Sequence, residues 1–314
     1  MRYLITGLIL LAATLHMMLP LSTLSLDPDL ARLILIELRL PRTLLVLGYG
    51  AVLGVSGAAL QAVFANPLAS PDITGASSSA ALGAVIGGYW FGLTQPLALA
   101  ACGGVGASAA LVMLVHLSSR RGDSTTLLLA GLAISLAAGA ATSLALALAP
   151  SPFAFYDAFD WLMGSFVDRS LGQAAAALIP AGIATALLLR RARALDLIAL
   201  GEDVAASLGI RPNALAIEVI ALSAIAVGAC VSVAGAIGFV GLVAPILARR
   251  LSAGHPGRAM VPAGVFGALL LTLADLIVRA IPLDRPIPVG VITALFGTPM
   301  FLWLVVTMRR RVTA

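Results

Sequence analysis

RRARALDLIALGEDVAASLGIRPN, residues 190–213, is the longest polar interruption in an otherwise apolar chain. Its composition predicts two short helical turns, one on each side of Gly201, because glycine ends the first turn and allows the chain to change direction. Leu200, Val204 and Leu208 recur at i, i+4 and i+8, so one side of this pair is apolar. The pattern indicates a surface that another protein binds. The alternative interpretation is an ordinary solvated loop.

The composition of the whole chain predicts that it lies in a lipid bilayer. Of its 314 residues, 61% are hydrophobic and 11% are charged, and the mean hydropathy is +1.07. A soluble domain carries roughly 25% charged residues, so this chain lacks the polar surface that water requires. Aromatic residues are few and ten-residue segments of alternating polarity are absent, which argues against an outer-membrane barrel. We therefore predict an all-α polytopic membrane protein with lipid as its surroundings.

Ten apolar runs reach or approach the roughly 20 residues that a membrane span needs. They are residues 3–19, 43–64, 76–91, 96–117, 125–149, 174–189, 214–236, 237–248, 259–281 and 289–306. The run at 237–248 is short, so it must be tilted, half-buried or extended at one end. The first run is kept as a helix, because the residues after it show no signal-peptide cleavage pattern. These runs predict a single transmembrane domain over residues 1–314, with about ten helices.

The arginines orient the predicted helices. All 19 basic residues are arginine, and short loops on the cytoplasmic side of a membrane are enriched in basic residues. With the N-terminus inside, 13 of the 19 lie on the cytoplasmic side, and six remain outside: Arg32, Arg39, Arg42, Arg169, Arg279 and Arg285. Both termini and the stretch at 190–213 are therefore predicted to be cytoplasmic. Because no basic stripe is interleaved with aromatic residues, a nucleic-acid surface is not expected.

Several kinds of chemistry are excluded by the residues that are missing. Without lysine the chain has neither a P-loop for ATP nor a Schiff-base residue, so any ATP that drives it binds another subunit. Cys102 and Cys230 are isolated in apolar runs, which supports neither a disulfide framework nor a metal site. His16, His116 and His255 are scattered and have no obvious partners in the sequence. We expect no catalytic residue, no metal and no cofactor in this chain.

Three of the outer arginines lie at the outer ends of predicted spans, where the positive-inside tendency disfavours basic residues. Arg39 and Arg42 flank Pro41 at the mouth of the second span, and Arg279 follows Asp275 with i, i+4 spacing near the end of the ninth. Cations at an outer mouth can pair with acidic groups of a docking partner. The alternative is that they only anchor the helix ends at the interface. Arg279 is expected to neutralise Asp275.

Two polar stretches lie at predicted helix ends on the cytoplasmic side. QAVFANPLASPDITGASSS, residues 61–79, forms a polar turn between the second and third spans, and Asn66 lies in it beside Leu68. Ser124 and Thr125 open the fifth span. Such side chains can cap a helix, and they can equally line a narrow passage.

Seven segments of the chain resemble the FecCD family, the permease subunits of bacterial ABC importers for ferric siderophores, haem and cobalamin. They are RLPRTLLVLGYGAVLGVSGAALQAVFANPLASPDITG (39–75), LLLAG (127–131), WLMGSF (161–166), ALGEDVAASLGI (199–210), GAIGFVGLVAP (235–245), LADLIVR (273–279) and PVGVITALFGTPMFLWLV (288–305). They follow one another in family order over nearly the whole chain. One such motif would be weak, but seven in register are specific.

The resemblance implies a cobalamin-importer-like fold with ten helices and a homodimer with its path between the copies. It also implies two ABC ATPases, which bind ATP and magnesium, and one periplasmic binding protein, all at the bacterial inner membrane. In the family pattern Arg39, Arg42 and Arg279 meet acidic groups of the binding protein. Asn66, Leu68, Ser124 and Thr125 match cytoplasmic gates. The ATPase-coupling residues, within helices at about 196–210, are Ala199, Leu200, Gly201, Glu202, Asp203, Val204, Leu208 and Gly209.

The chain departs from the family pattern at two places, where Ile246 replaces a usual histidine and Pro286 with Ile287 replace an acidic residue and leucine. The resemblance makes the chain a transport subunit rather than an enzyme, and we expect its cargo to be a ferric siderophore. Haem and cobalamin are the alternatives within the family. An ion-coupled secondary transporter is a further alternative, and it would need an intramembrane carboxylate as its relay; Asp275 is the candidate.

Overall fold

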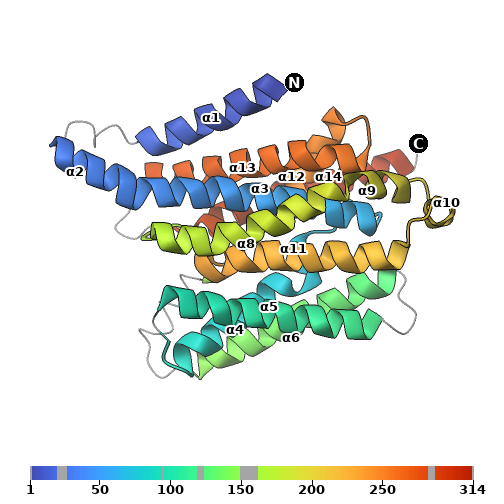
Figure 1. The fold of residues 1–314 in the computed structure, drawn as a ribbon, viewed down its shortest axis with the longest axis horizontal. Helices are drawn as coiled ribbons and strands as arrows, with labels where there is room; N and C mark the ends of the chain where they lie inside the picture. Colours follow the sequence, from blue (N-terminus) through green and yellow to red (C-terminus); the bar gives the residue numbers. More distant parts are fainter. Residues whose placement is uncertain are drawn as a thin grey trace.

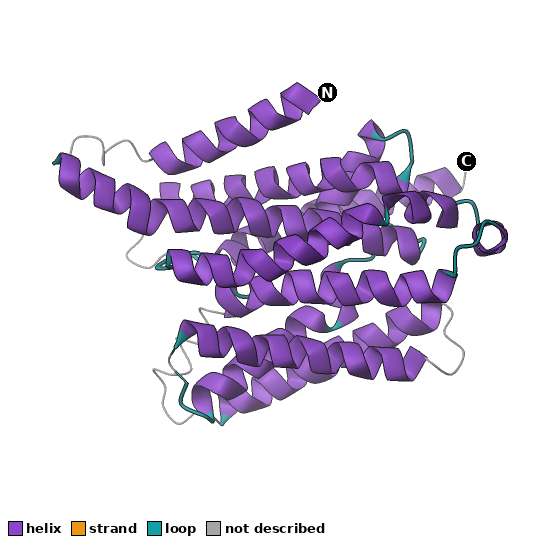
Figure 2. Cartoon of the chain, viewed as in Figure 1, coloured by secondary structure: helices purple, strands orange, loops and turns teal. Residues whose placement is uncertain are grey.

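The computed structural model describes residues 2–19, 27–93, 95–118, 124–148, 162–281 and 287–312, and within these residues the fold is entirely helical (Figure 1, Figure 2). In chain order the helices are α1 (Arg2–Met18), α2 (Pro28–Leu33), η2 (Ile34–Arg39), α3 (Leu40–Val63), η3 (Pro71–Thr74), α4 (Ala76–Tyr89), α5 (Pro96–Ser118), α6 (Ser124–Ala147), α8 (Leu171–Arg190), α9 (Ala192–Ile198), α10 (Glu202–Ser207), α11 (Pro212–Ala234), α12 (Val240–Leu251), α13 (Pro256–Ala280) and α14 (Val289–Val312).

Each of the ten predicted apolar runs forms a helix. Six stretches of the described chain are long and apolar enough to cross a membrane, and they correspond to α2–α3, α5, α6, α8, α11 and α13. The other four runs form α1, α4, α12 and α14. The prediction of an all-α polytopic membrane protein is confirmed.

The centre of the bundle is the pair formed by α3 and α13, which lie side by side in Figure 1. Their backbones touch where small residues face one another. A Cβ atom added to Gly54 would lie 2.0 Å from the carbonyl oxygen of Ala263, and one added to Gly50 would lie 2.4 Å from that of Gly267. In a bilayer the hydrophobic effect does not drive helices together, because lipid tails are as apolar as the helix surfaces. Small residues stabilise the pair instead, since they let the backbones approach closely and make van der Waals contact. The two helices therefore form one stiff unit.

A widened turn precedes α3. The helix that begins at Pro28 continues to Val63, but the segment η2 has the hydrogen-bond spacing of a π-helix, and the Leu40 amide donates to the carbonyl of Leu35. Pro41 follows directly. Proline cannot donate a backbone hydrogen bond and its ring crowds the carbonyl four residues earlier, so the turn before it opens. This widening directs the side chain of Arg39 toward the bundle, where only 6% of it is exposed.

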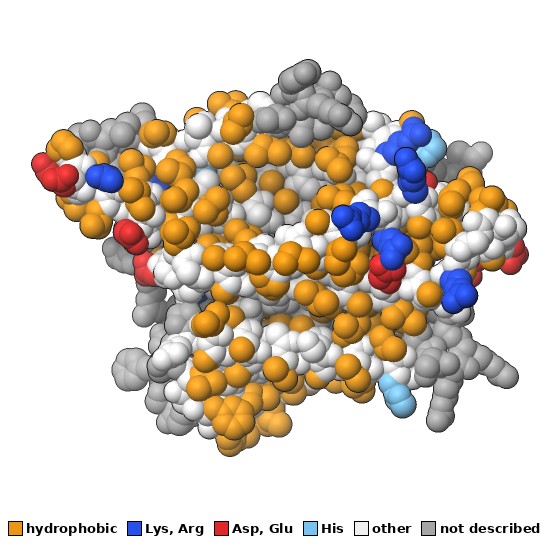
Figure 3. All heavy atoms as spheres, viewed as in Figure 1, with side chains coloured by type: hydrophobic (Ala, Val, Ile, Leu, Met, Phe, Trp, Pro, Cys, Tyr) orange, Lys and Arg blue, Asp and Glu red, His pale blue; other side chains and the backbone are white. Residues whose placement is uncertain are grey.

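The C-terminal end of α14 lies at the same end of the bundle as α9 and α10, whereas α2 lies at the opposite end, and α1 runs from the α2 side toward the middle of the bundle (Figure 1). In Figure 3 apolar side chains cover the middle of the visible face, and arginines gather mainly near α9 to α11. The prediction that the arginine-rich end faces the cytoplasm therefore refers to the α9–α10 end, and it stays a prediction. We call the α9–α10 end the inner end and the α2 end the outer end.

Candidate functional sites at the two ends of the bundle

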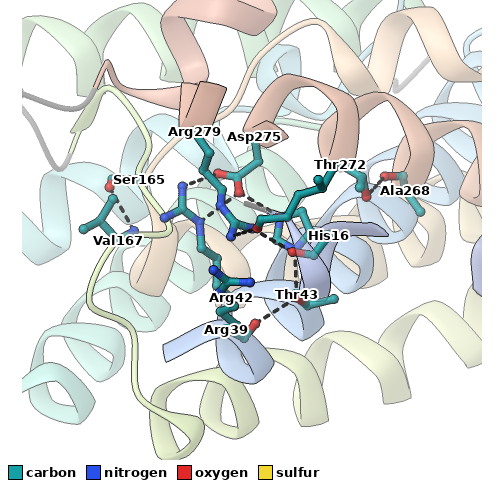
Figure 4. Close-up of polar contacts among 11 residues, drawn as sticks. His16, Arg39, Arg42, Thr43, Ser165, Val167, Ala268, Thr272, Asp275 and Arg279 are labelled. Atoms are coloured by element: carbon teal, nitrogen blue, oxygen red, sulfur yellow. Dashed lines mark hydrogen bonds and ion pairs between the residues drawn. The ribbon is translucent and has the colours of Figure 1, made fainter. Parts of the chain in front are cut away.

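At the outer end, the three predicted docking arginines come together with two further residues, a histidine and an aspartate (Figure 4). Arg39 ends η2 and Arg42 lies in the first turn of α3. Asp275 and Arg279 lie one turn apart near the end of α13, and His16 lies in the last turn of α1. We call these five residues the outer cluster. Three helices therefore meet through charged side chains at this end.

The carboxylate of Asp275 is fully buried and is paired with Arg42 rather than with Arg279. Nε and Nη2 of Arg42 each lie 2.8 Å from a different oxygen of Asp275, a bidentate arrangement. The prediction that Arg279 neutralises this carboxylate through its i, i+4 spacing is therefore wrong. A two-pronged contact from α3 is geometrically better than a one-turn contact along α13, because the planar guanidinium matches both carboxylate oxygens. Asp275 consequently has the surroundings of a structural ion pair and not those of a free proton relay.

Arg39 and Arg279 hold the end of α1. Nη1 of Arg39 donates to the carbonyls of Met17 at 2.8 Å and Met18 at 3.0 Å. Nη1 of Arg279 donates to the carbonyl of His16 at 2.8 Å, and its Nη2 donates to the carbonyl of Leu19. The last carbonyls of a helix have no partner within the helix, and they carry the negative end of its dipole. The two guanidinium groups therefore cap α1 as well as gathering positive charge at the outer end.

His16 is the functional candidate that the sequence did not reveal. It is fully buried, with Nε2 2.8 Å from Oδ2 of Asp275 and Nδ1 2.7 Å from Oγ1 of Thr43. The sequence shows no obvious partner for it, because its partners are 27 and 259 residues away. An ionisable residue inside an apolar helix needs a buried partner, so its location was a signal even though the partner could not be named.

At the inner end, α9 and α10 form the pair of short helices that the sequence predicted, and we call them the elbow. Gly201 joins them with φ 111° and ψ 146°, a conformation open to glycine and strained for other residues. Leu200, Val204 and Leu208 are 64%, 45% and 57% exposed, so the apolar stripe faces outward. The predicted coupling residues are exposed without exception: Ala199, Leu200, Gly201, Glu202, Asp203, Val204, Leu208 and Gly209.

The elbow is fastened to the membrane helices. Leu195 in α9 and Ala205 in α10 are fully buried. Oδ1 of Asp196 accepts a hydrogen bond of 2.8 Å from the backbone amide of Gly257, at the start of α13. A side chain at position 257 could not be accommodated, since a Cβ atom there would lie 1.9 Å from the carbonyl oxygen of Ala192. Asp196 thus caps α13 from outside and connects α9 to it rigidly.

The predicted gate residues are only partly described. Asn66 lies after the end of α3, and its side-chain oxygen accepts a hydrogen bond of 2.9 Å from the amide of Leu68. This contact stabilises the turn, and both side chains stay partly exposed. Ser124 and Thr125 open α6, but their side chains lie outside the described residues. Their role as a gate therefore remains a prediction.

The positions that depart from the family pattern lie in different surroundings. Ile246 is a partly buried residue of α12. Ile287 packs against the apolar core, and Pro286 lies outside the described residues. Among the residues that the structure describes, no group of three or more His, Cys, Asp or Glu side chains could hold a metal ion.

The sequence matches known transport proteins over most of its length. The model of the FecCD transport family matches residues 3–307. The vitamin B12 import permease BtuC of Vibrio cholerae is 36% identical over 97% of this chain and 93% of its own length. The hemin permease HmuU of Yersinia pestis is 39% identical, with 88% and 84% covered. The Fe(3+) dicitrate permease FecC of Escherichia coli is 37% identical, with 90% and 85% covered.

The fold agrees with a solved transporter. An inward-facing structure of a metal-chelate type ABC transporter superimposes with a TM-score of 0.87 and 29% sequence identity. The match covers 97% of this chain and 98% of that one. The similarity in fold therefore extends over nearly the whole chain.

Proposed function

The chain belongs to the FecCD transport family and is a permease subunit of an ABC importer, and we propose that it carries a ferric siderophore across the bacterial inner membrane. In this proposal both termini are cytoplasmic, and two copies of the chain form the path. Two separate ABC ATPases bind ATP at the inner end. A periplasmic binding protein delivers the cargo at the outer end.

The observation that carries the proposal is that α13 takes part in both candidate sites. Its first turn is capped by Asp196 of the elbow, and its last turns contribute Asp275 and Arg279 to the outer cluster. With 25 residues at 1.5 Å each, the helix spans about 37 Å, which exceeds the roughly 30 Å of a hydrocarbon core. Because α13 is also in backbone contact with α3, a displacement of the elbow reaches the outer end with little loss.

The elbow has an exposed apolar surface of the kind that another protein can bind. It exposes three large apolar side chains, Val204 on α10 and Leu200 and Leu208 just outside the two short helices, whose buried faces pack against the bundle. A rigid, apolar projection of this kind suits a cleft in an ATPase that closes when ATP binds. The ATPases shift the permease between its states only if they bind one state more tightly than the other. Because the elbow is attached to α13, its position changes with that of α13. The ATPases can therefore bind the elbow more tightly in one state of the permease than in the other.

The outer cluster supplies positive charge for docking. Arg42 is 17% exposed and Arg279 is partly exposed, so both can face acidic groups of a binding protein. Arg39 is only 6% exposed, so we assign it a supporting role in docking. Charge complementarity of this kind mainly accelerates encounter and orients the partner.

The homodimer is proposed from the family together with the exposed apolar side chains of α6 and α14. Leu129 and Leu136 on α6 are 58% and 67% exposed, and Leu295 and Phe296 on α14 are 64% and 60% exposed. A second copy or lipid must cover them. We propose that the second copy covers part of this surface and that cargo passes between the two chains.

The cargo is chosen from the chemistry that the relatives share. Vitamin B12, hemin and ferric dicitrate are the cargoes in the names of the three relatives, and each is a bulky metal chelate. A ferric siderophore belongs to the same chemical class, and the Fe(3+) dicitrate permease of Escherichia coli is nearest to it in chemistry. Haem and cobalamin are the alternative outcomes of the test.

The test is transport by the reconstituted importer. Vesicles containing this chain, its ATPase and its binding protein are supplied with a ferric siderophore, hemin or cobalamin, with and without ATP on the side of the membrane that the elbow faces. We expect ATP-dependent uptake of the siderophore that persists when ion gradients are collapsed. Replacing Glu202 and Asp203 by lysine should leave the chain folded but uncouple ATP hydrolysis from uptake. Uptake by vesicles that hold this chain alone, driven by an ion gradient, would contradict the proposal.

A further inference from the structure

The chain turns back into the bundle after α3, and this turn brings Asp72 to the middle of the membrane. A Cβ atom added to Gly241 in α12 would lie 2.8 Å from the ring of Pro71 and 3.2 Å from the carbonyl oxygen of Leu53. Pro71 therefore lies level with Leu53, which is about 20 Å along α3 from its outer end and about 15 Å from its inner end. Asp72, the next residue, consequently holds a carboxylate near the mid-depth of the bilayer.

Non-helical backbone lies beside this carboxylate. Asp72 belongs to the short helix η3, and a Cβ atom added to Gly238, between α11 and α12, would lie 3.8 Å from Oδ2 of Asp72. Irregular backbone at membrane depth is tolerated only where it is buried in protein or lines a water-filled cavity. Asp72 and Gly238 are both partly exposed, so the second case applies to them.

The carboxylate of Asp72 differs from that of Asp275 in its partners. Among the residues that the structure describes, no arginine or histidine forms an ion pair with Asp72. Two helices begin near it instead, α4 four residues later in the chain and α12 two residues after Gly238, and the positive end of a helix dipole stabilises an ionised carboxylate. Ionisable residues at membrane depth are costly, and they mark substrate or ion pathways.

Asp72 lies between α6 and α14, the two helices whose exposed apolar faces we assign to the homodimer. On one side, a Cβ atom added to Gly75, which follows η3, would lie 2.7 Å from the side chain of Ile134 in α6. On the other side, Phe239 packs against α14, where a Cβ atom added to Gly297 would overlap its ring. The surface between the two helices therefore has Asp72 near its middle.

We propose that Asp72 faces the cargo path and is a specificity-determining residue, which favours a neutral or positively charged chelate and disfavours an anionic one. This inference rests on the proposed function, because the path lies between two copies of the chain. Each copy contributes one carboxylate, and rings of acidic side chains favour cations in a pore. The hydroxyls of Ser78 and Ser135, 2.9 Å apart and partly exposed, add polar groups to the α6 side of this surface. A ferric hydroxamate fits this class of cargo, whereas a chelate with free carboxylates does not.

The direct test measures the charge beside Asp72 with two thiol reagents of opposite charge. The native cysteines, Cys102 and Cys230, are replaced by alanine, and Gly238→Cys places one thiol next to the carboxylate, where the added Cβ atom makes only an ordinary contact. The trimethylammonium and sulfonate forms of ethyl methanethiosulfonate are applied to the reconstituted importer with and without ATP. Both reagents attack the same thiolate, so the ratio of their rates, each divided by its rate with free mercaptoethanol, reports the local charge.

We expect the introduced thiol to react and to favour the cationic reagent about tenfold, the ratio that unit charges roughly 6 Å apart give even at the dielectric constant of water. Asp72→Asn should remove most of this preference, and Asp72→Glu should restore it. Ile183→Cys, in the middle of α8 and 60% exposed, is the lipid-facing control and should react with neither reagent. Ser135→Cys serves as a second reporter if Gly238→Cys does not fold. An unreactive thiol in a folded reporter, or a ratio that Asp72→Asn leaves unchanged, would overturn the proposal.

A second measurement concerns the cargo. The complete importer is supplied with ferric desferrioxamine B, a trihydroxamate chelate with one ammonium group, or with its N-succinyl derivative, which carries a carboxylate instead. The binding protein is the same for the parent and for Asp72→Asn, so a change in the ratio of the two uptake rates belongs to the permease. We expect the preference for the ammonium form to fall about fivefold in Asp72→Asn, less than for the reagents because the cargo charge lies farther away.

The outcomes of the uptake measurement separate this inference from the proposed function. An unchanged uptake ratio in Asp72→Asn would overturn the selective role of the carboxylate. ATP-dependent uptake of hemin alone would overturn both the ferric siderophore as cargo and the preference against anionic chelates. Uptake of a different ferric siderophore, without either desferrioxamine form, would leave the proposed function standing and overturn the cargo class named here. In each case the reagent ratio still decides whether Asp72 faces the path.

Discussion

Replacing Gly54 by alanine should separate the two central helices. Position 54 lies inside α3, where an added Cβ atom would be 2.0 Å from the carbonyl oxygen and 2.6 Å from the carbonyl carbon of Ala263, and 3.0 Å from Cα of Gly264. All three atoms belong to the backbone of α13, so no side chain can rotate away. To restore ordinary contact distances the helices must move apart by about 1 Å or more. The neighbouring contact of Gly50 with Gly267 would open at the same time.

The expected cost follows from two opposing effects. Alanine is a better helix former than glycine by about 1 kcal/mol, which favours the variant. Overpacking of a well-packed interior costs about 1–3 kcal/mol, and the upper part of this range applies because rigid backbone is displaced. The matched control is Gly182→Ala in α8, where an added Cβ atom would meet nothing within 4 Å. We therefore expect Gly54→Ala to be less stable than Gly182→Ala by about 3 kcal/mol.

The assay is equilibrium unfolding in mixed micelles with increasing SDS, followed by tryptophan fluorescence, on the parent and both variants. ATP-driven uptake is measured on the same proteins in vesicles, and we expect it to fall only in Gly54→Ala. Equal stability of the two alanine variants would refute the conclusion that α3 and α13 are in backbone contact. Full uptake by a destabilised Gly54→Ala protein would instead refute the role of this pair in carrying motion between the two ends.

Three further changes test individual contacts. Asp196→Ala removes the cap on the amide of Gly257, so the free energy of unfolding should fall by about 1 kcal/mol and uptake per ATP hydrolysed should decrease; Asp196→Asn, which keeps an acceptor, should lose less of both. Gly201→Pro cannot adopt a φ of 111° and loses the amide that donates to Ile198, so ATP hydrolysis should continue without uptake. Arg42→Glu leaves the buried Asp275 beside a like charge and should cost about 3–5 kcal/mol in the same unfolding assay, whereas near-normal stability would show that the pair is not buried in the protein.

Local patterns are enough to predict the ten apolar helices and the elbow of this protein. The elbow is predictable because Gly201 and Gly209 interrupt a polar stretch whose apolar residues Leu200, Val204 and Leu208 repeat at helical spacing, and both glycines have positive φ. The ten helices follow from apolar runs that bilayer thickness makes interpretable. The proximity of Arg39 and Arg42 follows from their spacing around Pro41. These features depend only on residues within a few turns of one another, so the local sequence is sufficient to predict them.

The pairing of side chains between helices is beyond the sequence. Asp275 has Arg279 one turn away, yet its carboxylate binds Arg42, 233 residues distant, and His16, 259 residues distant. Local spacing makes the nearer arginine the natural partner, but the packing of α1 and α13 against α3 decides otherwise.

The sequence by itself determined that this chain is a membrane-embedded helical bundle with an apolar elbow at its arginine-rich end. Each residue has its own preference for lipid or water, so composition and periodicity alone carry this information. Only the tertiary structure decided which charges neutralise one another at the outer end and that α13 connects that end to the elbow. A buried charge is stabilised by whichever opposite charge reaches it with the best geometry, and that geometry exists only once the helices have packed.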